Sequence, residues 1–261
     1  MPIITLTTDF GTRDHFAAAM KGVILGLAPK VNLVDITHDI EPFAVSEAAF
    51  TISEACRWFP QKTIHVCVVD PGVGSTRRPV LVESGGHYFV GPDNGLFGLI
   101  CARDRQAKAR HLTAAQYFRQ ERSQTFHGRD VFAPVAAHLA LGVRPALLGP
   151  LISDLARTTL ETPARTSTRT WVGAVLKVDR FGNLVTNFHL SEFPDLPRRQ
   201  ISMIAGIQPV DYLVRSYAEA PPDEAVAIIG SSGYLEVVVN QGSAAKLLGC
   251  GVGAPIELSI I

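Results

Sequence analysis

Residues 3–8, Ile-Ile-Thr-Leu-Thr-Thr, open the pattern that decides the fold of the first half of the chain. This short run is rich in β-branched residues, which predicts a strand. Residues 14–27 then carry apolar side chains at helical spacing, and Pro29 ends the predicted helix. A second strand, a second helix and a third strand are predicted over residues 31–36, 46–58 and 63–69. Because strands that alternate with helices pair in parallel through right-handed crossovers, the sequence predicts an α/β fold with a mostly parallel sheet.

The second half of the chain differs from the first in composition and residue pattern. Residues 156–170 are rich in Thr, Arg and Pro and show no sustained period, which predicts a linker. It separates an N-terminal α/β domain, residues 1–155, from a second domain, residues 171–261. Short strands separated by turn signals are predicted in the second domain over residues 172–178, 184–188, 201–204, 225–229, 235–239 and 256–260. Short strands at regular spacing predict a small barrel or sandwich.

The charge of the chain is balanced. Lys and Arg number 24, as do Asp and Glu, so the formal net charge at pH 7 is zero. Nucleic-acid-binding domains are usually strongly basic, and the chain also lacks the polybasic clusters that hold proteins to anionic membranes. No apolar run approaches the roughly 20 residues that a transmembrane helix needs. We therefore expect neither a nucleic-acid partner nor a membrane partner.

The N-terminal segment and the cysteines indicate the compartment. The chain opens directly as a strand, without the charged and apolar regions of a signal peptide. Its four cysteines are widely scattered, and no pair has the Cys-x-x-Cys spacing of a zinc ribbon or redox motif. Reduced thiols in a cytoplasmic protein are the simplest interpretation.

Three aspartates occupy one kind of position. Asp9, Asp70 and Asp179 each end a predicted strand and are followed within three residues by glycine. Ligands of open parallel sheets bind beyond the carboxyl ends of the strands, and glycine permits tight turns and close approach to a ligand. Asp and Gly also build ordinary turns, which would explain any one of these aspartates. Three in the same setting favour a polar ligand site.

Two further residues supply titratable partners. Arg77 follows Asp70 by seven residues, and His127 lies just before a helix predicted over residues 130–141. Asp, Arg and His together can orient a water molecule and stabilise developing hydroxide. The residues alone favour a capping or packing role for His127, and His38, which also follows a strand, competes with it for the catalytic role. The chain has no P-loop, no nucleophile elbow and no His-Glu-x-x-His motif, so the residues alone predict only an α/β enzyme with a carboxylate-rich site.

Six sequence blocks resemble a known family. They are TTDFG, VDPGVGS, GPDNG, FHGRD, DRFGN and SSGYLE, at residues 7–11, 69–75, 91–95, 126–130, 179–183 and 231–236. In this order they are similar to the blocks of the S-adenosylmethionine hydroxide adenosyltransferases, which are relatives of the fluorinase and chlorinase that use the same substrate. The blocks span nearly the whole chain, and their order makes the resemblance specific where any single block would be weak.

The resemblance implies an activity and an assembly. It implies hydrolysis of S-adenosyl-L-methionine to adenosine and L-methionine without a cofactor or metal, and a C-terminal β-barrel domain. It also implies a homotrimer with sites between subunits. Asp70, Arg77 and His127 match the triad that handles water, with the choice of base between Asp70 and His127 left open. The halide-using relatives lack this triad, so the resemblance favours hydroxide as the nucleophile.

The resemblance also implies which residues bind the ribose and the methionine ammonium. Asp9 matches the carboxylate that accepts hydrogen bonds from both ribose hydroxyls, a bidentate role that suits ionised oxygens. Phe43 matches an aromatic side chain that packs on the ligand. Asp14 and Asp179 match groups near the methionine ammonium, where an anion is favourable.

The remaining substrate-binding residues lie in the second domain. Phe181 and Asn183 match residues around adenine, and Ser231 matches a hydroxyl near the methionine carboxylate. The halogenases have an arginine where this chain has Ser232. The resemblance is therefore weakest for the recognition of the carboxylate.

Two other functions fit parts of the sequence. A metal-dependent hydrolase of a nucleoside-type substrate is one, because oxygen and nitrogen ligands are available at Asp9, Asp14, His38, Asp39, Asp70 and His127. Activity that survives a chelator would argue against it. A non-catalytic sensor of S-adenosylmethionine or adenosine is the other, although a pure binder has no use for a positioned water molecule.

Overall fold

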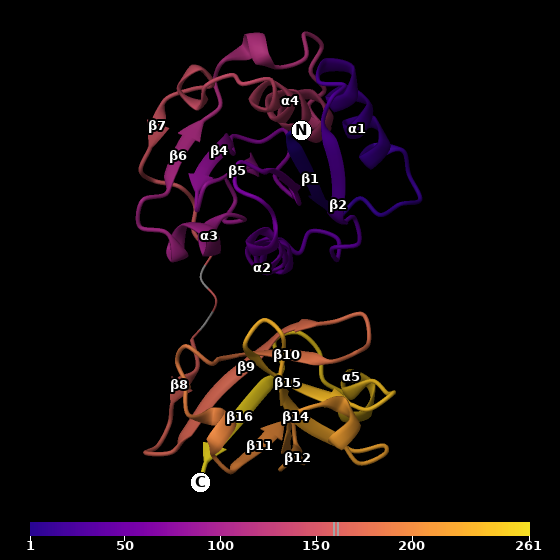
Figure 1. Ribbon diagram of the computed structural model, residues 1–261, viewed down its shortest axis with the longest axis vertical. Coiled ribbons are helices and arrows are strands. Elements are labelled where there is room, and N and C mark those ends of the chain that lie inside the picture. Colours follow the sequence, from indigo (N-terminus) through magenta and orange to yellow (C-terminus); the bar gives the residue numbers. More distant parts are fainter. Residues whose placement is uncertain (159, 161) are drawn as a thin grey trace. The chain divides into compact units, whose positions relative to one another are not determined.

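The computed structural model describes residues 1–158, 160 and 162–261. The chain divides into two compact units, Met1–Thr159 and Leu160–Ile261, and each is described by itself (Figure 1). The linker predicted over residues 156–170 includes two residues that lie outside the described part of the chain. Within it, Ala164–Arg165 forms a short strand, β8, which pairs with β9 (Thr170–Val178) of the C-terminal unit.

A seven-stranded sheet forms the centre of the N-terminal unit, in the order β2-β1-β3-β5-β4-β6-β7. Its strands, in chain order, are Ile3–Thr8, Asn32–Thr37, Ile64–Val68, Pro79–Ser84, His87–Pro92, Lys108–His111 and Leu151–Ile152. The parallel pairing predicted for the first three strands is confirmed, and β5 joins β3 in parallel as well. Strands β4, β6 and β7 continue the sheet with antiparallel pairings.

Helices cover both faces of this sheet. They are α1 (Phe16–Leu27), α2 (Val45–Ala55), α3 (Gly98–Arg103) and α4 (Ala133–Ala140), and a π-helical turn over Gly128–Phe132 leads into α4. Strand β3 shows why two layers are needed. Val66 and Val68 pack in the cluster that includes α1 and α4, whereas Cys67 packs in the cluster that includes α2. Both faces of the strand are buried, so each needs a helical cover.

The C-terminal unit is a curled nine-stranded sheet with the path β12-β11-β16-β9-β10-β15-β14-β13 and β8 beside β9 (Figure 1). Strands β10 to β16, in chain order, are Leu184–His189, Ile201–Ala205, Gln208–Val210, Leu213–Val214, Ala225–Ile229, Tyr234–Val239 and Pro255–Ile260. The sheet curls around its own apolar core, which includes Phe188 and Leu235, and α5 (Ala244–Leu248) packs on that core. The β-barrel-type domain expected from the sequence is therefore present. No helix among the described residues is long and apolar enough to span a bilayer.

Strand β3 also buries a histidine. The side chain of His65 is fully buried, with Nδ1 2.8 Å from Thr5 Oγ1 and Nε2 3.3 Å from His87 Nδ1. Its ring stacks on Phe89 at a centroid distance of 4.9 Å. Burial, with a smaller contribution from the neighbouring His87, lowers the pKa of His65 to about 3. The native protein therefore keeps His65 neutral in mildly acidic solution.

This burial predicts a pH-dependent stability. The pKa of His65 is about 3 in the folded protein, below the ~6.5 of an unfolded chain, so only the unfolded state takes up the proton between these values. The stabilisation is complete above pH 6.5 and is lost as the pH falls toward 3, by up to about 1.4 kcal/mol per pH unit. Urea unfolding at pH 6.5 and 5.5 should show this loss in the parent. His65→Asn should reduce the slope, and an unchanged slope would contradict the prediction.

Candidate active site

Asp70, Arg77 and His127 form one partly buried group in the N-terminal unit. Asp70 lies just beyond β3, Arg77 lies two residues before β4, and His127 precedes the π-helical turn. Arg77 Nε donates to Asp70 Oδ1 at 3.0 Å, and its Nη2 donates to Oδ2. The same Nη2 lies 2.9 Å from His127 Nδ1. The Asp70 and Arg77 side chains are only 6% and 8% exposed, so solvent screens their attraction little.

These hydrogen bonds define the protonation of His127. An arginine side chain carries only donors, so Nδ1 of His127 must accept, and the proton of the neutral ring lies on Nε2. Burial lowers the pKa of His127, and the neighbouring Arg77 lowers it further. Arg77 Nη1 is buried and has no hydrogen-bond partner among the described residues. A donor left in this state requires an acceptor such as an enclosed water molecule.

A cavity of about 320 Å³ lies beside this group. Asp9, Asp70 and His127 are its titratable lining residues, and no Lys or Arg of the described chain contributes to the lining. Most of the remaining wall is aromatic or aliphatic, from Phe10, Phe16, Pro42, Phe43, Val68, Val73 and Phe126. Two carboxylates with aromatic rings and no lining cation favour a positively charged ligand that has an apolar body.

Asp9 also shapes the loop opposite the strand ends. Its Oδ2 accepts a hydrogen bond from the backbone N–H of Phe43 at 3.0 Å. Phe43 has a φ of 69°, in the left-handed region that is costly for a residue with a side chain. Its ring is 70% exposed and borders the cavity. The aspartate therefore holds an aromatic side chain in a strained position on the rim of the cavity.

Two residues from the sequence analysis are not brought to this wall. Asp14 is exposed before α1 and does not line the cavity. His38 is buried, with Nδ1 2.8 Å from Thr8 Oγ1 and Nε2 3.1 Å from Asp35 Oδ1. Neither contact of His38 involves Asp70. In the described part of the chain, no three His, Cys, Asp or Glu side chains are grouped so that they share a metal ion.

Asp179 organises a turn in the C-terminal unit. Its Oδ1 accepts from the backbone N–H groups of Phe181 and Asn183 at 2.8 and 2.9 Å, and its Oδ2 accepts from Asn183 Nδ2 at 2.9 Å. Phe181 and Asn183 line a second cavity, of about 480 Å³, together with Tyr217. The ring of Phe181 is 76% exposed. The turn thus presents a flat aromatic side chain beside a polar amide.

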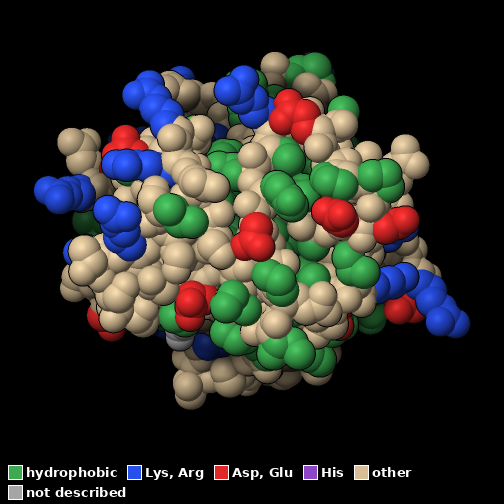
Figure 2. All heavy atoms as spheres, turned by 90° about the horizontal axis from the view of Figure 1, so that it is seen from below, with side chains coloured by type: hydrophobic (Ala, Val, Ile, Leu, Met, Phe, Trp, Pro, Cys, Tyr) green, Lys and Arg blue, Asp and Glu red, His purple; other side chains and the backbone are tan. Residues whose placement is uncertain are grey.

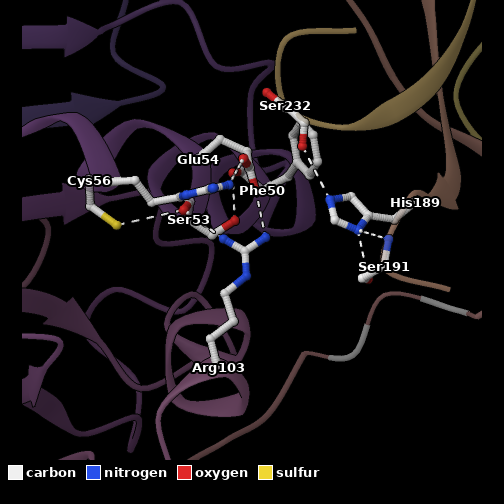
Figure 3. A network of polar contacts seen from close by, with 9 residues as sticks. Phe50, Ser53, Glu54, Cys56, Arg103, His189, Ser191 and Ser232 are labelled. Atoms are coloured by element: carbon white, nitrogen blue, oxygen red, sulfur yellow. Dashed lines mark hydrogen bonds and ion pairs between the residues drawn. The ribbon is translucent and has the colours of Figure 1, made fainter. Parts of the chain in front are cut away.

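His189, which the sequence analysis did not single out, supports the loop that carries Ser231 (Figure 3). Its Nδ1 accepts from the backbone N–H of Ser191 at 3.1 Å, so its Nε2 donates to the carbonyl of Ser232 at 3.2 Å. Figure 3 also shows Arg103, which in the N-terminal unit ties α3 to Glu54 of α2. No motif marks His189, because its partner in the Ser231 loop is a main-chain carbonyl more than 40 residues away.

The fold and the site define a class of protein: an α/β unit and a barrel-type unit, with a partly buried Asp-Arg-His group beside a cavity lined by apolar side chains and two carboxylates. The chain belongs to the SAM hydroxide adenosyltransferase family. The model of the family's N-terminal domain matches residues 4–149, and that of its C-terminal domain matches residues 173–257.

Known proteins show the same relationship along the whole chain. A relative from Salinispora arenicola named (R)-S-adenosyl-L-methionine hydrolase is 38% identical over 260 residues, which cover 99% of this chain and 98% of the relative. A fluorinase from Nocardia brasiliensis is 26% identical over 292 residues, at 99% and 97% coverage. A crystal structure of an uncharacterized conserved protein from Thermotoga maritima has a TM-score of 0.92 at 31% identity, and covers 98% of this chain and 99% of that one.

Proposed function

We propose that this enzyme hydrolyses S-adenosyl-L-methionine to adenosine and L-methionine, with water attacking C5′ of the ribose. The observation that carries the proposal is the Asp70–Arg77–His127 group beside a cavity that also contains Asp9. The higher identity to the hydrolase than to the fluorinase supports water over halide as the nucleophile. A cavity with carboxylates, aromatic rings and no lining cation suits a sulfonium substrate.

The chemistry requires little acid catalysis. The water oxygen forms a bond to C5′ while the C5′–S bond breaks, and the bonding pair leaves on sulfur as a neutral thioether. No proton has to reach the leaving group. The enzyme must instead align oxygen, carbon and sulfur and remove one proton from water, whose pKa in bulk is about 15.7.

Asp70 is the better candidate for the base. Its carboxylate oxygens each accept one hydrogen bond from Arg77 and keep lone pairs for a water molecule. His127 directs its Nδ1 lone pair to Arg77, so its remaining nitrogen carries a proton and donates. In this arrangement Asp70 accepts the proton of water, and His127 Nε2–H holds the oxygen. The buried and unpartnered Nη1 of Arg77 is a further donor available to hydroxide-like charge.

The substrate-binding roles follow the resemblance. Asp9 would bind the ribose diol with Phe43 packed above it, and both residues border the same cavity. The remaining roles are adenine at Phe181 and Asn183, the methionine ammonium at Asp14 and Asp179, and the methionine carboxylate at Ser231. The role of the Ser231 loop can be tested at His189, which contacts the carbonyl of the adjacent Ser232.

Substitution of His189 should affect methionine recognition selectively. The Nε2 of Gln can still reach the Ser232 carbonyl, whereas the shorter side chain of Asn cannot. His189→Asn should therefore raise KM for S-adenosylmethionine about five- to tenfold, the equivalent of the ~1 kcal/mol of one hydrogen bond, and His189→Gln should raise it less. Adenosine affinity, measured by calorimetry, should stay unchanged in both. An equal loss of adenosine affinity would instead indicate a general disturbance of the unit.

The assembly that we propose is a homotrimer with sites at subunit interfaces. The two cavities lie in different units, and the exposed rings of Phe43 and Phe181 border them. Figure 2 shows hydrophobic side chains gathered over one face, with Lys and Arg toward its margin. Exposed apolar side chains mark interaction surfaces when they gather in patches. Sedimentation equilibrium tests this, and a monomer at micromolar concentration would contradict it.

We also propose the compartment and the configuration of the substrate. All four cysteines are free thiols, which fits the reducing cytoplasm. The Salinispora arenicola relative is named for the R configuration at sulfur, and we extend this preference to the present chain. Separate incubation with the two sulfur epimers tests the preference, which requires faster turnover of the R form.

One experiment tests the reaction and separates it from the two rival functions. Pure protein is incubated with S-adenosylmethionine in oxygen-18 water, with and without chelator, and the products are separated by chromatography. Adenosine and methionine should form in equal amounts with the label in the 5′-hydroxyl, at the same rate in both samples. Loss of activity with chelator would support the metal-dependent hydrolase. Binding without turnover would support the sensor, and methylthioadenosine as product would overturn the reaction class.

A further inference from the structure

The block Gly91-Pro92-Asp93-Asn94-Gly95 has no role in the function described so far. Gly91 and Pro92 end β5, Asp93 to Gly95 follow it, and β5 lies between β3 and β4 in the sheet. Because β3 is parallel to β5 and β4 is antiparallel to it, the end of β5 adjoins both the end of β3 and the start of β4. Asp70 leaves the sheet at the first of these points and Arg77 returns to it at the second. The turn after β5 therefore lies between the two chain segments that carry the ion pair.

Side chain and backbone of this turn contact both segments. Asn94 Nδ2 donates to the carbonyl of Val69, the residue before Asp70, at 2.9 Å. The backbone N–H of Asp93 donates to the carbonyl of Arg78, the residue after Arg77, at 2.9 Å. The turn thus holds the main chain on either side of the Asp70–Arg77 pair.

The carboxylate of Asp93 adds further contacts to this turn, and we call the contacts of Asp93 and Asn94 together the frame of the Asp70–Arg77 pair. It is 4% exposed and accepts from Arg78 Nε at 2.8 Å through Oδ2 and from the backbone N–H of Ala156 at 2.8 Å through Oδ1. Arg78 also bonds Asp154. Two adjacent arginines consequently have separate carboxylate partners: Arg77 pairs with Asp70 and Arg78 pairs with Asp93. Because Arg78 pairs with Asp93, it does not compete with Arg77 for Asp70. Asp70 and the remaining N–H groups of Arg77 are then available to the reacting water.

We propose that Asp93 and Asn94 are positioning residues of the water-handling triad, an inference that rests on the proposed function. Neither residue lines the cavity. They fix the main chain before Asp70 and after Arg77, and so fix the distance and orientation of the two side chains. A displacement of about 1 Å at a reacting group can cost on the order of 10²-fold in rate, so the frame controls turnover while substrate affinity stays the same.

Asn94→Ala tests the frame, and Asp104→Ala is its matched control. Asp104 accepts from the backbone N–H groups of Gly85 and Gln106 at 2.9 and 2.8 Å, at the other end of the β4–β5 hairpin. Asn94→Ala should lower kcat about 10–100-fold, with KM and adenosine affinity within about twofold of the parent. Asp104→Ala should lower thermal stability similarly and leave kcat unchanged. Asp93→Asn, whose single carbonyl oxygen can accept from only one of Arg78 and Ala156, should keep more kcat than Asp93→Ala and less than the parent.

A second readout is independent of turnover. The Nε–H of Arg77 donates to Asp70, and its ¹⁵N NMR signal, assigned by its loss in Arg77→Lys, reports that bond. Asn94→Ala should shift this signal and speed its exchange, whereas Asp104→Ala should leave it unchanged. If the parent does not hydrolyse S-adenosylmethionine but the signal responds in this way, the proposed function fails and the positioning role stands. Equal effects of the two variants on kcat and on the signal would overturn the inference.

Discussion

Replacement of Asp70 by Asn is expected to lower the single-turnover rate of S-adenosylmethionine hydrolysis by about 10²–10⁴-fold, the range that general acid–base help contributes. The amide keeps the size of the carboxylate but cannot take a proton from water. It also presents an NH₂ group to Arg77, whose Nε and Nη2 both donate in the native pair. Substrate affinity should change far less, because water and not the nucleoside is the main partner of this group.

The triad should also behave as a unit. His127→Ala should give a loss of similar size, since it removes the acceptor of Arg77 Nη2 and the donor to water. The double variant Asp70→Asn/His127→Ala should be little slower than the poorer single variant, because groups that serve one water molecule are non-additive. Single-turnover rates and adenosine binding are measured for each variant, so that slow product release cannot mask chemistry. Parental rates in His127→Ala would remove that residue from the mechanism.

Local pattern was sufficient to predict the first half of the α/β unit. The β-branched run before Asp9 and the apolar run before Asp70 define β1 and β3, and the helices between them leave only a parallel pairing. From that topology alone, the two aspartates are expected at one edge of the sheet. In the structure both line one cavity.

The later strands of the sheet were harder to predict from the residue pattern. Strands β6 and β7 have four and two residues, and α3 has six, which is too short for a period to show. The helix predicted over residues 130–141 is in the structure a π-helical turn that continues into α4. This turn begins directly after His127, so the geometry at the site differs from that of a regular helix start.

The grouping of the site residues depends on contacts that sequence order conceals. His127 lies 50 residues beyond Arg77, and nothing in this separation predicts the contact between them. Asn94 and His189 act on main-chain carbonyls, at Val69 and Ser232. Every residue has a carbonyl, so such a partner leaves no signature in the sequence. Supporting residues of this kind are identified only when the fold brings the segments together.

Asp9→Ala is expected to weaken adenosine and substrate binding by about 1.5–3 kcal/mol for each charge-assisted hydrogen bond that is lost. The carboxylate ends β1 on the cavity wall, and one of its oxygens already accepts from the N–H of Phe43. The other oxygen and the remaining lone pairs are available to two ribose hydroxyls. Calorimetry with adenosine and 2′-deoxyadenosine isolates this role. The parent should prefer adenosine, and Asp9→Ala should lose that preference.

Phe43→Gly is the matched control, because Asp9→Ala also releases the loop that carries Phe43. Glycine adopts a φ near 69° without strain, so the backbone bond to Asp9 can persist while the ring is removed. This variant should weaken binding of both nucleosides by the same factor and leave their ratio unchanged. Loss of the ratio in Asp9→Ala together with its retention in Phe43→Gly assigns the diol to the carboxylate and the packing to the ring. Equal affinities of the parent for the two nucleosides would instead remove the diol role from Asp9.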